Sequence, residues 1–589
     1  MKFLLSTLVF LLTGFIVTGQ TLNQIYDPVV VGHPPDNAFN GLVQLSDGEL
    51  RHYGFEGEWF QPENHIYISS KDNGLMWEKH IITDSVLFAD ENMPPAVCSP
   101  YSGDFIRLIG TPKGTLVLRS DNGINGPYRK MQIDTAPHDM IRHPLFLKTR
   151  KRMLVTCGRS ILKEGREVMQ ACVYYSDDDG HIWNISYVPV GPVFTVEWPH
   201  KKPRWQNYAI EPTIAELKDG KLWMLLRTSM DRLYESFSED HGSTWTIPAP
   251  SRFYSTLTMP TFFRMKDGRL LLFFCGTTPL PEEDRSADTT IREEQKNGLW
   301  EDVFTNRDVI HAAISDDDGK TWKGFRELYL NPLRNESDFA TSGGNKVSLD
   351  KSVHQSQAVE LPGGKVLVAL GQHSLVRAMI IFDPGWLYGK ERADNFTNGL
   401  NNWSTFKYIK GIKGHCAYNR DPGPRLVDHP DEANKKILNI RHLINSKFVC
   451  DVDGAVWNFP ASTKGSFSTR IMLKSGSKGG RISLIDRWFN PTDTLAYRYA
   501  MYTLKFDGNG NSDYGQILEP DKWTELTLEW NDLQSGPCSL KINHKPYVYT
   551  LPLRFPPING INYVQFQSVT YEEDKVGYLI ESVKAVVRN

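Results

Sequence analysis

The pattern Ser-x-Asp-x-Gly-x-x-Trp occurs four times in this chain and constrains its fold more than any other feature. The copies begin at Ser70, Ser176, Ser238 and Ser315. Each follows a short apolar run that predicts a β-strand, so each copy is expected to form the turn after a strand. The aspartate suits local backbone amides, the glycine permits a positive φ, and the tryptophan covers the end of the hairpin. Four recurrences of this pattern indicate an internally repeated β-structure.

A second signal marks another hairpin in the repeated units. Strand-like residues run into Asp-Gly or Gly-Gly at Gly48, Gly220, Gly268 and Gly364, and weaker copies occupy 96–103 and 145–152. Asp-Gly between alternating strands is a strong hairpin signal. The signals mark six units between about residue 37 and residue 387, and no region shows sustained helical periodicity. The sequence therefore predicts six blades in an all-β fold.

The four Ser-x-Asp-x-Gly-x-x-Trp turns resemble the Asp boxes, or BNR repeats, of sialidase-like β-propellers. The resemblance implies a six-bladed β-propeller at residues 21–390 and covers that part of the chain only. It identifies a scaffold and no particular reaction. A polar, charged insertion at 277–307 predicts a long loop over one face, a candidate lid on the substrate side.

Residues 391–589 comprise an irregular linker and short alternating strands, such as 467–473 and 523–530, and they lack the repeat. Short strands with polar turns predict a β-sandwich. This part resembles the lectin-like jelly rolls appended to carbohydrate-active enzymes. For Trp488 and Tyr497 core packing is the favoured role, and stacking on sugars is the alternative for each.

Residues 1–20 open with a lysine, continue with an apolar run and end in small and polar residues. This order is typical of a signal peptide and predicts a secreted or periplasmic protein. No other stretch is apolar enough to span a membrane. The net charge of −3 gives no electrostatic footprint for nucleic acid. The seven cysteines lack metal-site spacing and the Asp-rich turns lack calcium-loop spacing, so we expect neither a metal nor a cofactor.

Ligands of propellers bind at one mouth of the central axis, near the starts of the innermost strands. Counting back from the turn glycines aligns those starts and brings together side chains from blades three, four and six. They are Arg142, His143, Glu211 and His354, and Arg227, His373 and Arg377 follow them across their hairpins. Arg420 is expected to reach back to this mouth from the linker.

The segment Glu211–Arg227 resembles the sialidase segment that carries a catalytic glutamate and a carboxylate-binding arginine. Two other matches fail. Ala38 stands where sialidases place an arginine, and Gln355 stands where their tyrosine nucleophile belongs. Because glutamine cannot act as an aryloxide nucleophile, we do not expect an ordinary sialidase mechanism.

The remaining residues suit an anionic sugar. Arginines grip a carboxylate or sulfate, and histidines with a carboxylate supply an acid and a base near neutral pH. We therefore predict β-elimination, by a lyase or dehydratase, at the non-reducing end of an acidic oligosaccharide that contains uronic acid and carries sulfate in some forms. The predicted catalytic residues are His143, Glu211 and His354; the predicted binding residues are Arg142, Arg227, His373, Arg377 and Arg420.

Two other functions remain open at this point. The first is an exo-glycosidase, sialidase-like or specific for another acidic sugar, in which Glu211 is active and water attacks in place of tyrosine. The second is a non-catalytic glycan-binding protein. For individual residues, His143 has a packing role as its alternative, and Glu211 and Arg227 have a structural ion pair as theirs.

Overall fold

The computed structural model describes the chain except residues 1–20, 37–39, 59–60, 83–94, 164–165, 192–208, 279–305, 337–351, 415–416, 445–451, 535, 546–548, 571 and 589. The expected signal peptide, Ala38 and all but the ends of the expected loop at 277–307 lie outside the described residues. Within them, no helix is long and apolar enough to cross a bilayer.

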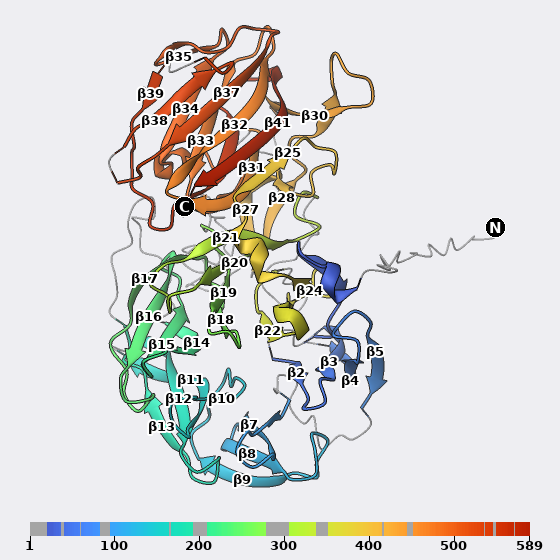
Figure 1. Cartoon of the computed structure of the whole chain (residues 1–589), viewed down its shortest axis with the longest axis vertical. Helices are drawn as coiled ribbons and strands as arrows, with labels where there is room; N and C mark the ends of the chain where they lie inside the picture. The colour runs from blue at the N-terminus through green and yellow to red at the C-terminus, as the bar shows by residue number, and fades with distance from the viewer. Residues whose placement is uncertain are drawn as a thin grey trace, which may run out of the picture.

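Six antiparallel sheets of four strands stand around an axis in the lower half of Figure 1. Blade one contains β2 (Leu42–Gln44), β3 (Leu50–Glu58), β4 (Gln61–Ser70) and β5 (Glu78–Ile81). Blade two contains β6 (Val97–Cys98), β7 (Phe105–Thr111), β8 (Gly114–Ser120) and β9 (Arg129–Asp134). Blade three contains β10 (Leu145–Phe146), β11 (Met153–Lys163), β12 (Arg166–Ser176) and β13 (Asn184–Tyr187). Blade four contains β14 (Ile210–Glu216), β15 (Leu222–Arg227), β16 (Arg232–Ser238) and β17 (Ala249–Tyr254). Blade five is β18 (Thr261–Arg264), β19 (Leu270–Phe274), β20 (Val309–Ser315) and β21 (Lys323–Leu330).

The sixth blade closes the ring with a strand from the other end of the domain. Its strands β22 (Gln357–Glu360), β23 (Val366–Leu370) and β24 (Ala378–Phe382) pair in order, and β1 (Val29–Gly32) adds antiparallel to β24. The Gln357 side chain also exchanges two hydrogen bonds with the backbone of Leu42 in blade one. The sequence placed the first of the six repeat units at about residue 37 and so left out β1. The pairing of β1 with β24 therefore corrects the predicted composition of blade six.

The four Asp boxes occupy the turn between the third and fourth strands of blades one, three, four and five. In each, the serine hydroxyl donates to the aspartate and accepts from the glycine amide, at 2.7–2.9 Å. The residue before the glycine and the glycine itself both have positive φ. Three of the tryptophans donate to the glycine carbonyl at 2.9 Å, and Trp245 donates to Ser186 Oγ instead. The predicted turn chemistry is thus confirmed.

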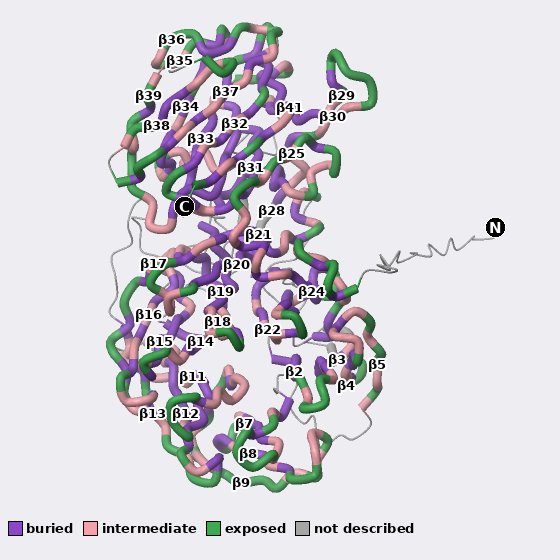
Figure 2. The backbone as a smooth tube through the Cα atoms, in the orientation of Figure 1, coloured by how far each residue is buried: buried purple, intermediate pink, exposed green. Residues whose placement is uncertain are grey.

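The upper half of Figure 1 is a β-sandwich of two sheets. One sheet contains β25 (Glu391–Asp394), β29 (Leu426–Asp428), β30 (Lys436–His442), β32 (Lys464–Leu473), β37 (Trp523–Trp530), β38 (Cys538–Ile542), β39 (Tyr549–Leu551) and β41 (Asp574–Arg588). The other contains β26 (Trp403–Ser404), β31 (Gly454–Ser462), β33 (Gly479–Ile485), β34 (Tyr502–Asp507) and β40 (Ile561–Ser568). A separate hairpin of β27 (Lys407–Gly414) and β28 (Ala417–Asp421) follows β26 in the chain. Figure 2 shows buried backbone along both facing sheets.

Apolar and polar contacts hold the sandwich against blade five. Trp488 is fully buried and packs in one cluster with Phe406 and with Val309 of β20. His311 of β20 lies 2.6 Å from the Tyr563 hydroxyl, which also donates to Glu327 of β21. Trp488 is therefore a core residue of this junction, which confirms the favoured role of core packing and excludes a sugar platform.

Tyr497 is half-buried and has a guanidinium over its ring. The Arg481 Cζ lies 4.0 Å from the ring centroid, in cation–π contact. The Arg554 Cζ lies 5.7 Å from the same centroid, so two cations already contact this ring, and stacking on a sugar stays a prediction.

Candidate functional site

Glu211 begins the innermost strand of blade four in a strained backbone conformation. Its φ is +48°, in the left-handed region that residues other than glycine, asparagine and aspartate seldom occupy. The pairing of β14 with β15 shifts register between Ile210 and Thr213, so Glu211 lies in a β-bulge. Bulges re-aim side chains at functional sites, and strain of this kind persists where the surroundings impose it.

The Glu211 carboxylate forms an ion pair with Arg227 across the hairpin. Glu211 Oε2 lies 2.8 Å from Arg227 Nη1, and the two side chains are only 9% and 12% exposed. Arg227 ends β15, opposite Ile210. The structure therefore brings together the two residues of the sialidase-like segment. This contact is compatible with a structural ion pair and with a functional pair.

Arg142 and His143 approach from blade three, immediately before β10. Burial lowers the pKa of Arg142 to about 10, Glu211 opposes this change, and Arg227 adds to it, so all three charges act on one another. The guanidinium lies against the sulfur of Met259, which precedes the inner strand of blade five. Arg142 thus reaches past blade four toward blade five.

His143 points to blade one. Its Nε2 lies 2.5 Å from the Asn40 carbonyl oxygen, and because a carbonyl only accepts, Nε2 carries the proton. The Nδ1 of this tautomer is a lone-pair acceptor. Burial lowers the pKa of His143 to about 4, with the Asn40 carbonyl opposing the shift and Arg142 adding to it. The imidazole is therefore neutral at pH 7.

The predicted residues of blade six lie close to the start of blade one. His354 is buried, and its carbonyl accepts the Gly371 amide. The His373 carbonyl accepts the Arg377 amide, and its Nδ1 accepts the Leu375 amide. Arg377 Nη1 lies 3.2 Å from Asp36 Oδ1.

Gln355 shares the unusual backbone of Glu211. Its φ is +62°, and it stands at the aligned position of blade six. Among the four inner-strand starts that the structure describes, two thus have a left-handed residue that is neither glycine nor asparagine. Blade six offers an amide at the place where a sialidase has its nucleophile.

Arg307 belongs to the same end of the propeller and was not among the predicted residues. It is buried, its guanidinium donates to the Leu257 carbonyl, and its own carbonyl accepts the Val353 amide at 3.0 Å. It therefore joins the starts of blades five and six, beside His354. Its position just before β20, at the mouth end of that strand, was the one signal that could have identified it.

Arg420 reaches the propeller as predicted, but through the junction. Its Nη1 lies 2.8 Å from Asp308 Oδ2, and its guanidinium stands over Phe406 at 5.1 Å from the ring centroid. Asp308 also accepts from Asn331 and directly follows Arg307. A role for Arg420 in contacting substrate stays a prediction.

One cluster within the described part of the chain has the spacing of metal ligands. Ligand atoms of His429, Glu432 and Glu581 all lie within 4.8 Å of one another. The Lys435 ammonium contacts both carboxylates. His429 Nδ1 accepts the Asp431 amide, so its Nε2 carries the proton and faces the acids. A lysine and an N–H donor already serve these carboxylates, and we assign no metal here.

Comparisons with known proteins concern the propeller first. Residues 117–368, from β8 in blade two to β23 in blade six, match the BNR repeat-like domain. Together with the Asp-box turns, this match identifies a sialidase-like Asp-box propeller, and the chain carries this domain followed by a β-sandwich. No curated protein matches the sequence.

Solved structures of similar shape include three at low identity. A protein of unknown function from Dyadobacter fermentans is 17% identical, over 61% of this chain and 98% of that chain, with a TM-score of 0.37. Trypanosoma rangeli sialidase is 13% identical, over 95% and 92% of the two chains, with a TM-score of 0.35. A point mutant of NanB sialidase from Streptococcus pneumoniae is 13% identical, over 61% and 71%, with a TM-score of 0.38.

Proposed function

We propose that this protein is an exported enzyme that binds the non-reducing end of an acidic oligosaccharide at the Glu211–Arg227 end of the propeller and acts there by β-elimination at a uronic acid, as a lyase or a dehydratase. The observation that carries the proposal is the buried Glu211–Arg227 pair in a β-bulge, with Arg142 in its electrostatic field. Export rests on the leader-like residues 1–20.

The arginines supply the first requirement of elimination. A uronate carboxylate makes the adjacent C5 proton removable only when its charge is neutralised. Arg227 and Arg142 are the candidate partners, because guanidinium groups bind carboxylates bidentately. In the proposed complex the sugar carboxylate lies beside Arg227, next to Glu211.

The histidines supply the proton transfers. The base takes the C5 proton, the C5–H electrons form the C4–C5 double bond, and the C4–O bond breaks as its oxygen gains a proton. His143 is the candidate base, since its imidazole is neutral at pH 7 and Nδ1 has a lone pair. Its pKa of about 4 rises once a bound carboxylate offsets Arg142. His354 is the candidate acid, and Glu211 holds Arg227 in position.

Hydrolysis is the second candidate, and the likeness of the Glu211–Arg227 segment to sialidases favours it. In that reaction Glu211 activates a water molecule, since Gln355 cannot form a covalent intermediate. The substrate is then sialic acid or another acidic sugar at the chain end.

Absorbance separates the two reactions. Incubation with uronate oligosaccharides is expected to produce the absorbance band of unsaturated uronates. Release of a free sugar without that band would overturn elimination in favour of hydrolysis. Undiminished glycan binding by a variant lacking Glu211, His143 and His354, with no turnover by the parent, would identify a non-catalytic binding protein.

A further inference from the structure

A second hollow lies between the linker and the sandwich, apart from the propeller site. Its volume is about 450 Å³, and its polar lining is Lys407, Asp421, Arg425, Asn439, Arg441 and Asp453. The lining comes from the β27–β28 hairpin, the residues before β29, and β30. Hollows of roughly 300–1,000 Å³ are typical of sites for small ligands.

One wall of this hollow is preformed. It is the segment Pro422–Gly423–Pro424, in which the prolines fix φ. A Cβ on Gly423 would lie 1.4 Å from the Thr405 carbonyl oxygen, so this backbone rests directly on that of Thr405. Because the wall is held in place, a ligand does not have to order it on binding.

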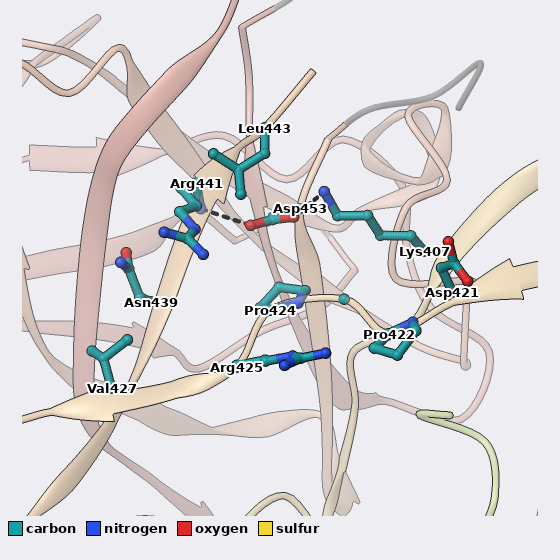
Figure 3. A pocket seen from close by; sticks show the side chains of 11 residues that line it. Lys407, Asp421, Pro422, Pro424, Arg425, Val427, Asn439, Arg441, Leu443 and Asp453 are labelled. Carbon is teal, nitrogen blue, oxygen red and sulfur yellow. Dashed lines mark hydrogen bonds and ion pairs between the residues drawn. The ribbon is translucent and has the colours of Figure 1, made fainter. Parts of the chain in front are cut away.

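Two of the charged groups in the hollow neutralise each other. Lys407 Nζ lies 2.6 Å from Asp453 Oδ1, and Asp453 Oδ2 accepts the Arg441 amide. Figure 3 shows the Lys407 ammonium directed to Asp453, which lies between it and Arg441. This pair belongs to the framework of the hollow.

Three polar side chains of the lining have no such partner. Arg425 is exposed and Arg441 half-buried, and within the described structure neither guanidinium forms an ion pair or a side-chain hydrogen bond, although the charge of Arg441 opposes the rise that burial causes in the pKa of Asp453. Asn439 is only 8% exposed, and its Oδ1 has no hydrogen-bond donor among the described residues. In Figure 3 the side chains of Arg441, Asn439 and Arg425 border the same space.

These groups specify the chemistry of a ligand. Two unpaired guanidiniums fit an anionic oxygen group, and a buried carbonyl acceptor without a donor fits a hydroxyl. Asp421, on the far side of the hollow from Asn439, accepts further hydroxyls. We infer that this hollow binds one carboxylated or sulfated sugar unit and is a second glycan site, independent of the reaction at Glu211.

The test is calorimetric titration of the whole protein in a Glu211→Gln, Arg227→Met background, which disables the propeller site. The probes are a tetragalacturonate, a sulfated galactose tetrasaccharide and a neutral galactose tetrasaccharide. We expect one binding site for at least one acidic probe and none for the neutral probe. Comparison of the two acidic probes shows whether carboxylate or sulfate is preferred. No binding of either acidic probe in this background overturns the inference.

Further substitutions in that background locate the site. Arg441→Met and Arg425→Met are each expected to weaken binding at least tenfold. The control Lys505→Met removes an exposed charge from β34 of the same sandwich and should leave affinity within twofold. Thermal unfolding checks that each variant is folded. Because Arg425 is exposed, Arg425→Met is less apt than Arg441→Met to disturb the fold. Unchanged affinity in both arginine variants contradicts the assignment, whatever the propeller site does.

Discussion

The two ends of blade four contrast sharply although one sheet joins them. At the outer end, the serine and aspartate of the Ser238 Asp box form the same local bonds as in three other blades, and only Trp245 departs, by donating to Ser186. At the axial end, Glu211 is held by Arg227 and stands in the field of Arg142 from another blade. The repeated end is scaffold, and the end that differs in each blade is where function is to be sought.

Backbone strain follows the same division. The left-handed residues before the box glycines are Asn73, Asp179, His241 and Asp318, which are types that tolerate this region. The left-handed residues at the axis are Glu211 and Gln355, which tolerate it less well. The turns are thus built from residues suited to them, whereas the axial end accepts a cost for the direction of its side chains.

Glu211→Gln should have the largest effect. It removes a charged group from the axial site while keeping its size, and we expect turnover of an acidic oligosaccharide to fall by about 10²–10⁴-fold. Initial rates and thermal unfolding of the same preparation measure activity and folding separately. A rate within twofold of the parent would remove Glu211 from the mechanism.

Acid should act on the axial end before it acts on the turns. His143 has a pKa of about 4 in the folded protein and about 6.5 in the unfolded chain. Its contribution to the free energy of unfolding is therefore full above pH 6.5 and is lost as pH falls through 4. The loss is at most about 3 kcal/mol. Unfolding free energies of the parent and of His143→Gln, measured from pH 7 to pH 4, should converge as pH falls.

The turns should respond in a lower window of pH. Burial raises the pKa of Asp317, yet hydrogen bonds from Thr321 and Ser315 outweigh burial and hold this pKa below its ordinary 3.8. That stabilisation is present above about pH 4 and is lost as pH falls further. If the difference in unfolding free energy between the parent and His143→Gln were the same at all pH values, the separation of the two pH windows would be refuted.

Asp317→Ala should destabilise the fold without changing the site. It deletes the acceptor of the Ser315 hydroxyl and of the Thr321 amide and hydroxyl, and we expect a loss of about 2 kcal/mol. Denaturant unfolding gives this value, and turnover per folded molecule should stay unchanged. Asp121→Ala, in the corresponding turn of blade two, is the matched control, because its Arg129 pair is exposed and contributes under about 1 kcal/mol.

The smallest effect is expected at a hairpin glycine. Gly48 has φ of +90° and open space where a Cβ would stand, so Gly48→Ala should cost about 1 kcal/mol from backbone strain alone. Gly319→Ala should cost more, since its Cβ would lie 2.3 Å from the Trp223 ring. Equal losses in denaturant unfolding would show that the Asp-box glycine is not constrained by packing.

Local chemistry made the propeller predictable. The Asp boxes and Asp-Gly turns are short-range signals, so six blades followed from sequence. The pairing of β1 with β24 joins residues some 350 positions apart and leaves no local trace. Core packing was the favoured role for Trp488, but its partners could not be foreseen, because Phe406 and Val309 come from other segments.

The candidate site was predictable in its residues but not in its connections. Alignment of the blades selected Glu211, Arg227 and Arg142, which the structure brings together. It could not foresee the left-handed backbone of Glu211, the contact of His143 with Asn40, or the pairing of Arg420 with Asp308. Arg307 was missed because its segment follows a long insertion that shifts the spacing of the repeat.

The most direct test of the division between scaffold and site is mass analysis of acidic oligosaccharides incubated with the parent, Glu211→Gln and Asp317→Ala. We predict a terminal unsaturated product, lighter by one water than the hydrolysis product, from the parent and from folded Asp317→Ala, and none from Glu211→Gln. Undiminished product from Glu211→Gln, or its loss from folded Asp317→Ala, would contradict the account.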